Sequence, residues 1–204
     1  MLNNETIAAI ATPPGTGGIG VVRVSGKKTR IIAKHIIDGL PPKRTAVIRT
    51  FVNGAGEALD SGLAVYFQGP NSYTGEDVLE LQGHGGPGVL RLILRACIDA
   101  GARLAEPGEF TKRAYLNSKL DLAQAESVAD LIGASSEAAV LSAHRSLSGE
   151  FSTRTEQIKT ELIEARVFVE AAIDFSEEEI DFLKDESVKD RLNGVHLSLV
   201  QLRE

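Results

Sequence analysis

VLELQGHGGPGVLRLILRACIDA, residues 78–100, decides how the first half of this sequence folds. Val78–Gln82 is a short apolar run typical of a β-strand, and the glycine-rich segment 83–87, which ends in proline, breaks it. From about Val89 to Ala100 the apolar residues recur at helical spacing. A strand that is followed directly by a helix predicts a helix packed on a sheet.

The residues before this stretch continue the alternation of strands and helices. Strands are predicted at 6–11, 20–25, 46–52 and 63–67, a short helix at 28–37, and a turn-rich segment at 68–75. Some of the predicted strands are joined by links of hairpin length and others by a helix. We therefore predict an α+β domain with a mixed β-sheet and packed helices.

The remainder of the sequence is predicted to be helical. Three apolar stripes recur at spacings of three and four residues, within 122–132, 158–172 and 188–202. Ser176 with Glu179 matches a capping box at a helix start. Because isolated amphipathic helices are marginal in water, the stripes must pack on other helices. The last stripe reaches the final residues without a cap, so we expect an incomplete all-α helical bundle.

Charge is distributed unevenly between these two parts. Residues 1–118 carry 13 basic and 10 acidic side chains, whereas residues 119–204 carry 9 basic and 18 acidic ones. We predict two domains with these bounds. The first can receive an anionic ligand, and the second is a poor surface for nucleic acid on its own.

Composition limits the class of protein. The single cysteine, Cys97, excludes an internal disulfide and a cysteine zinc cluster, and its apolar surroundings predict a buried side chain rather than a nucleophile. No apolar run approaches the roughly 20 residues that cross a bilayer, and the first residues lack the pattern of a secretory signal. We expect a cytoplasmic protein without a membrane partner.

Three glycine motifs fail in their context. Gly15, Gly17 and Gly20 match G-x-G-x-x-G, but they lead into a predicted strand instead of a helix, which excludes a dinucleotide loop. We interpret them as a turn or as a close approach of a ligand to the backbone. Gly26-Lys27 is a near miss for a P-loop. The turn at 83–86 resembles the oxyanion turn of esterases, but the nucleophile motif G-x-S-x-G does not occur.

The histidines offer no metal-ligand spacing, so we assign no catalytic residue and no metal ligand. Glu80 is unusual because it lies inside a predicted strand, where apolar or β-branched residues are favoured. It is either on the exposed face of an edge strand or a carboxylate in a pocket, where it can accept two adjacent N–H groups of a pterin ring. Arg23, on another predicted strand, can pair with Glu80 or with a ligand carboxylate.

Several segments, in this order and spacing, resemble the MnmE family, also called TrmE. The matching segments are TIAA at 6–9, ATPPG at 11–15, GGI at 17–19, RVSG at 23–26, PNSYTGED at 70–77, Glu80 with HGG at 84–86, PGEFTKRA at 107–114, NSKLDLAQAE at 117–126 and EAAIDF at 170–175. The resemblance covers essentially the whole chain.

The resemblance implies an N-terminal domain similar to folate-binding aminomethyltransferases, which binds 5-formyl-tetrahydrofolate and forms a homodimer. Family members add a carboxymethylaminomethyl group to the wobble uridine of certain tRNAs, in a complex with the flavoprotein MnmG. Their helical domain is interrupted by a GTPase domain that uses GTP, Mg²⁺ and K⁺. The GTPase segment and the C-terminal cysteine motif do not occur in these residues, so we expect this stretch alone to lack GTP hydrolysis.

Carried over by position, the folate contacts of the family fall on Arg23, Glu80 and Lys119. The resemblance implies that Glu80 holds the pterin edge, while Arg23 and Lys119 offset the carboxylates of the ligand. Two other interpretations stay open. One is a free-standing folate-dependent aminomethyltransferase, and the other is a structural dimerisation module with a vestigial pocket.

Overall fold

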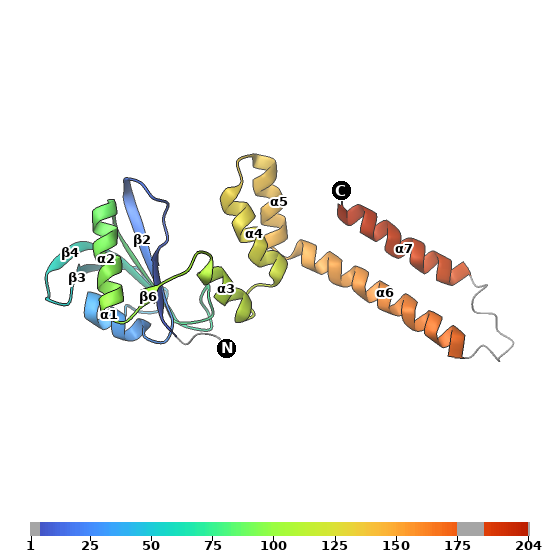
Figure 1. Ribbon diagram of the computed structural model, residues 1–204, viewed down its shortest axis with the longest axis horizontal. Helices are drawn as coiled ribbons and strands as arrows, with labels where there is room; N and C mark the ends of the chain where they lie inside the picture. Colours follow the sequence, from blue (N-terminus) through green and yellow to red (C-terminus); the bar gives the residue numbers. More distant parts are fainter. Residues whose placement is uncertain (1–4, 175–185, 204) are drawn as a thin grey trace. The chain divides into compact units, whose positions relative to one another are not determined.

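The computed structural model describes residues 5–174 and 186–203, and the chain divides into two compact units, Met1–Leu120 and Asp121–Glu204. The first unit is built on a six-stranded sheet in the order β3-β4-β5-β2-β1-β6 (Figure 1). Its strands are β1 (Ile7–Ile10), β2 (Gly17–Ser25), β3 (Val47–Val52), β4 (Ala58–Phe67), β5 (Val78–Gly85) and β6 (Arg103–Leu104). β1 and β6 are parallel and the other pairs are antiparallel, which confirms the predicted mixed sheet.

Two helices, α1 (Thr29–Ile37) and α2 (Pro87–Asp99), pack on one face of this sheet. Side chains along a strand alternate between the two faces, so every second strand residue meets the helices. The shared core includes Ala8, Val22, Val24, Ile32, Ile36, Phe51, Ala64, Leu79, Leu81, Leu90, Ile93 and Cys97. Arg23 and Glu80 are one residue out of step with this core and therefore lie on the opposite face.

The glycines of β2 are part of the strand rather than of a turn. A Cβ atom at Gly20 would lie 2.5 Å from Cδ1 of Leu90, which belongs to α2. The sequence interpretation of a turn or a ligand approach was therefore wrong for Gly20, because this glycine lets a helix pack closely on the sheet.

Some elements of the first unit differ from the prediction. β5 continues through His84 to Gly85, because pairing with β2 extends to Gly17 and carries the strand past the expected glycine break. β6 was not predicted, because two residues are too short for a periodicity to show. The helix α3 (Glu109–Leu116) lies in the part that was predicted to be helical, although no apolar stripe marked it.

The second unit is helical, as predicted. It contains α4 (Leu122–Gly133), α5 (Glu137–Leu147), α6 (Glu150–Asp174) and α7 (Glu186–Arg203). α4 begins with a capping box, in which the N–H of Gln124 donates to Asp121 Oδ1 and the N–H of Asp121 donates to Gln124 Oε1, both at 2.9 Å. The capping box predicted at Ser176 and Glu179 lies outside the described residues.

α6 and α7 run side by side (Figure 1). Ile158, Ala165 and Val195 are buried, whereas Leu162 and Leu199 of the predicted stripes are each 51% exposed. The stripes are therefore only partly covered by the helices that the structure describes. No helix within 5–174 or 186–203 has the length and apolar content required to cross a membrane.

Candidate functional site

Arg23 and Glu80 form an ion pair on the sheet face opposite α1 and α2. They are direct partners in the register of β2 and β5, so their side chains project from neighbouring positions. Arg23 Nε donates to Glu80 Oε1 at 2.9 Å, and Arg23 Nη2 lies 2.7 Å from the same oxygen. The side chains are 29% and 16% exposed, so the pair is partly desolvated but still reachable by a ligand.

Two aromatic rings flank the guanidinium of Arg23. The ring centroids of Tyr73 and Phe110 lie 5.6 Å and 5.7 Å from its central carbon, within the range of cation–π interactions. Tyr73 belongs to the loop 68–77 between β4 and β5, and Phe110 belongs to α3. The hydroxyl of Tyr73 lies 2.9 Å from Oγ1 of Thr111, also in α3. The loop and the helix therefore meet at the ion pair.

Lys119 lies directly after α3 and is exposed. Its backbone N–H donates to the carbonyl of Ala114 at 2.8 Å, which fixes the turn that ends the helix. A Cβ atom at Gly75 would lie 3.3 Å from Cγ of Lys119, so the aliphatic part of the lysine packs on the loop that carries Tyr73. Its ammonium group makes no hydrogen bond or ion pair with any residue that the structure describes.

The structure brings two of the three predicted site residues into contact and connects the third through the 68–77 loop. The sequence left two partners open for Arg23, and the partner in this structure is Glu80. Both contacts fall on Oε1, so Oε2 takes neither of them. A carboxylate oxygen, two aromatic rings and an exposed ammonium group are suited to a flat polar heterocycle with an anionic tail.

Sequence reasoning assigned no role to Tyr73 or Phe110. Both lie in segments that carry the family resemblance, at 70–77 and 107–114. The family resemblance therefore marked both segments, but a role for the two rings in the candidate site follows only from their contact with Arg23.

His84 is held by Asp60 at the end of β5. Its Nδ1 lies 2.7 Å from Asp60 Oδ1, and its backbone N–H donates to Oδ2 at 2.7 Å. Burial raises the pKa of Asp60, but the hydrogen bonds from His84 and Ser61 outweigh it, so the pKa lies below its ordinary value. In the turn that resembles that of esterases, Asp60 therefore orients the side chain of His84, which is 75% exposed. No cluster of metal-binding side chains occurs in the described part of the chain.

Family models match nearly the whole chain. Residues 6–119 match a family described as GTP-binding protein TrmE N-terminus, and residues 122–204 match one described as MnmE helical domain.

Similar curated proteins carry the name tRNA modification GTPase MnmE. The one from Chromohalobacter salexigens is 56% identical over 203 residues, which are 100% of this chain and 44% of the relative. That from Saccharophagus degradans is 58% identical over 94% of this chain and 42% of the relative. That from Nitrosomonas eutropha is 55% identical over 99% of this chain and 45% of the relative. The chain spans less than half the length of these relatives.

Proposed function

Because the chain belongs to the TrmE (MnmE) family, we propose that its first unit binds a reduced folate of the 5-formyl-tetrahydrofolate class. The observation that carries this proposal is the Arg23–Glu80 ion pair, which is partly exposed on the sheet face opposite α1 and α2 and has two aromatic rings beside its guanidinium. An ion pair on a sheet surface contributes little to stability. The position of Arg23 beside aromatic rings from two other segments is better explained by recognition.

Glu80 is the proposed anchor for the pterin ring. A pterin offers an amino group and a ring N–H side by side, and one carboxylate can accept both. Arg23 uses only Oε1, so Oε2 can accept a ligand N–H while Arg23 keeps the carboxylate oriented. Each such charge-assisted hydrogen bond contributes about 1.5–3 kcal/mol.

Tyr73, Phe110 and Lys119 supply the remaining contacts in this proposal. The two rings offer flat apolar surface next to the guanidinium, which suits a planar heterocycle. Lys119 is exposed and carries a positive charge without a protein partner among the described residues. We assign it to the carboxylates of the folate tail, where opposite charge favours binding.

We propose that this folate site serves tRNA modification in the cytoplasm. With an MnmG-like flavoprotein, the whole protein would add a carboxymethylaminomethyl group to the wobble uridine of certain tRNAs, with the folate as one-carbon source. The name shared by the relatives supports this role. Residues 1–204 contain no P-loop motif, so we assign GTP, Mg²⁺ and K⁺ to none of them.

Homodimerisation through the first unit is part of the same proposal. Ile48 and Leu63 are register partners in β3 and β4 and are 73% and 38% exposed. Leu63 precedes Ala64, which faces α1 and α2, so the two apolar side chains lie on the opposite face of the sheet. Exposed apolar side chains of this kind support an association surface.

Calorimetric titration of the 204-residue chain with 5-formyl-tetrahydrofolate tests the folate site. We expect saturable binding by the native chain and at least about tenfold weaker binding by Glu80→Ala, since a charge-assisted contact is lost. Glu57→Ala is the matched control. Glu57 is exposed at the β3–β4 turn, and the described residue that hydrogen-bonds it is Asn53 of the same turn.

The outcomes separate the remaining interpretations. Unchanged affinity in Glu80→Ala would remove Glu80 from the site. A chain that takes up no ligand at saturating concentration would support a structural dimerisation module instead. Transfer of an aminomethyl group from a lipoyl-carrier protein would support a free-standing aminomethyltransferase.

A further inference from the structure

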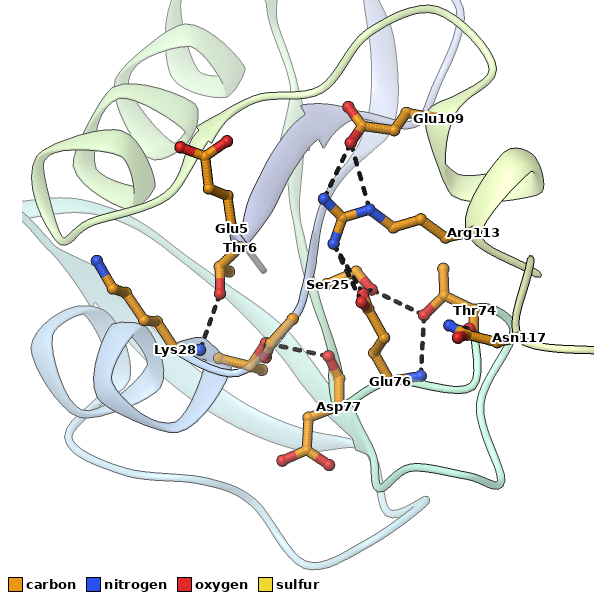
Figure 2. A network of polar contacts seen from close by, with 12 residues as sticks. Glu5, Thr6, Ser25, Lys28, Thr74, Glu76, Asp77, Glu109, Arg113 and Asn117 are labelled. Atoms are coloured by element: carbon orange, nitrogen blue, oxygen red, sulfur yellow. Dashed lines mark hydrogen bonds and ion pairs between the residues drawn. The ribbon is translucent and has the colours of Figure 1, made fainter. Parts of the chain in front are cut away.

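A network of charged and hydroxyl side chains joins the 68–77 loop, β2 and α3 (Figure 2). Its centre is Arg113 of α3, whose side chain is only 4% exposed. Arg113 Nη2 donates to Glu109 Oε1 at 2.9 Å, and Arg113 Nη1 donates to both oxygens of Glu76 at 3.2 Å and 3.0 Å. Glu109 also accepts two hydrogen bonds from Arg103, at 2.8 Å and 2.6 Å. Arg113 therefore bridges two carboxylates from different segments.

Glu76 anchors this network in the 68–77 loop. Its Oε2 accepts a hydrogen bond from the hydroxyl of Ser25 at 2.7 Å, and that hydroxyl lies 2.7 Å from Oγ1 of Thr74. Asn117, which ends α3, donates to the backbone carbonyl of Thr74 at 2.7 Å. The loop is thus tied on one side to β2 and on the other to α3.

The same two segments carry the outer parts of the site. Tyr73 precedes Thr74, and Phe110 follows Glu109, so each aromatic ring that flanks Arg23 is a direct neighbour of a network residue. The stem of Lys119 packs on Gly75. A shift of the loop relative to α3 would therefore separate Tyr73 from Phe110 and the loop from the stem of Lys119.

We infer that the Arg113–Glu76 ion pair is a positioning device for the folate site, which rests on the function proposed above. It fixes the loop to α3 before the ligand arrives, so that the two aromatic rings already lie beside Arg23 and the stem of Lys119 already packs on the loop. Arg113 is too deeply buried to touch a ligand itself, with a side-chain exposure of 4%. Its effect on binding is transmitted through the loop.

Pre-organisation makes a specific kinetic prediction. If only a fraction of the molecules holds the loop in place, the association rate falls with that fraction, whereas dissociation from the completed site stays the same. Loss of overall stability has no such effect at temperatures where every variant is folded. The division between the two rates therefore distinguishes positioning from a purely structural role.

Stopped-flow binding of 5-formyl-tetrahydrofolate to Glu76→Gln and Arg113→Lys tests the inference. Glu76→Gln keeps an oxygen for Ser25 but loses the charge, and Arg113→Lys keeps the charge but loses the fork that spans two carboxylates. We expect association about tenfold slower and dissociation within about twofold of the native chain. Arg95→Lys and Asp99→Asn, an exposed pair in α2, are the matched controls and should bind as the native chain does.

Amide hydrogen exchange without ligand supplies a second measurement, which also serves if Arg113→Lys does not fold. In Glu76→Gln, amides of residues 69–77 should exchange faster, while those of β2 and β5 keep their native rates. Native association rates in folded variants, or slower association with unchanged loop exchange, would overturn the inference. Either result leaves the proposed function intact as long as the native chain binds and Glu80→Ala binds at least about tenfold more weakly. Failure of the native chain to bind would refute the proposed function instead.

Discussion

Two nitrogens of Arg23 converge on one oxygen of Glu80, Oε1, and leave the other oxygen to different partners. An arginine that takes both oxygens of a carboxylate uses one acceptor position on each, so a ligand finds both oxygens already engaged. An arginine on one oxygen orients the carboxylate and leaves acceptor capacity. The ion pair thus joins β2 to β5 and leaves Oε2 of Glu80 without a contact from Arg23.

This geometry predicts that Arg23 and Glu80 act as a unit in folate binding. Glu80→Gln should weaken affinity about tenfold or more, because the charged acceptor is lost, and Arg23→Lys should cost less, because it removes only the orienting contact. The double variant should lose less than the sum of the two free-energy changes, since residues in contact are not additive. Calorimetry of the four proteins measures this, and strict additivity would contradict the pairing.

Two glycines should differ in their tolerance of a side chain. A Cβ atom at Gly62 would lie 2.1 Å from the carbonyl oxygen of Gln82, a backbone atom of the neighbouring strand, whereas one at Gly20 meets the end of the Leu90 side chain. Side-chain ends move more easily than paired backbone. Gly62→Ala should therefore lower the free energy of unfolding by about 3 kcal/mol and Gly20→Ala by about 1–2 kcal/mol.

Urea denaturation of the two glycine variants provides the comparison. The order of the two effects is the informative result, because both substitutions add the same methyl group. A larger loss for Gly20→Ala would mean that α2 cannot yield around Leu90.

Glu109 predicts a pH dependence of stability. Hydrogen bonds from Arg103 lower its pKa to about 2 from 4.5, with burial opposing the shift and further contributions from the Glu106 N–H and Arg113. A carboxylate with a depressed folded-state pKa stabilises the fold above its unfolded pKa, and this stabilisation is lost as the pH falls toward the folded value. The stability that Glu109 supplies should thus be complete above about pH 4.5 and disappear toward pH 2.

Unfolding free energies across this acidic range check the prediction, with Glu109→Gln as the comparison. The variant should be less stable near pH 6 by about 3 kcal/mol, because two buried or half-buried arginines lose their partner. The difference between the two proteins should shrink toward pH 2. A constant difference at every pH would remove the titration of Glu109 as the cause.

Cys97 should be inert in the folded protein. It is fully buried in the core between α2 and the sheet, and burial raises the pKa of its thiol to about 12. The thiolate is the reactive form, so labelling with a thiol reagent at pH 8 should be slow in buffer and fast in urea. Labelling of the native chain at the rate of a free thiol would contradict the burial.

Much of the first unit could be predicted from local patterns, because 78–82 and 89–100 each carry the periodicity of one element. The end of β5 could not, since the glycines at 83 and 85 read as a break and remain in the sheet only through pairing with β2. Gly20 was misread for a similar reason. A glycine in sequence does not reveal whether a ligand, a turn or the side chain of Leu90 needs the space.

In the candidate site, too, local sequence pattern predicted some residues and missed others. Glu80 stood out because a carboxylate inside a strand is unusual, and Arg23 could be named as one of its partners. Tyr73 and Phe110 are separated from Arg23 by 50 or more positions, so no local pattern links the three. Arg113 looks like an ordinary basic residue of a short helix until its burial of 96% becomes visible.

The order of the sheet has a consequence for the newborn chain on the ribosome. β1 precedes the other strands of this sheet. It pairs along one edge with β6 at Arg103–Leu104, and Arg103 Nε also donates to Glu5 Oε2, 98 positions earlier in the chain. Until residue 104 has left the exit tunnel, one edge of β1 has no strand to pair with. Translation arrested upstream of that point would therefore leave an unpaired strand edge that can template pairing with another chain.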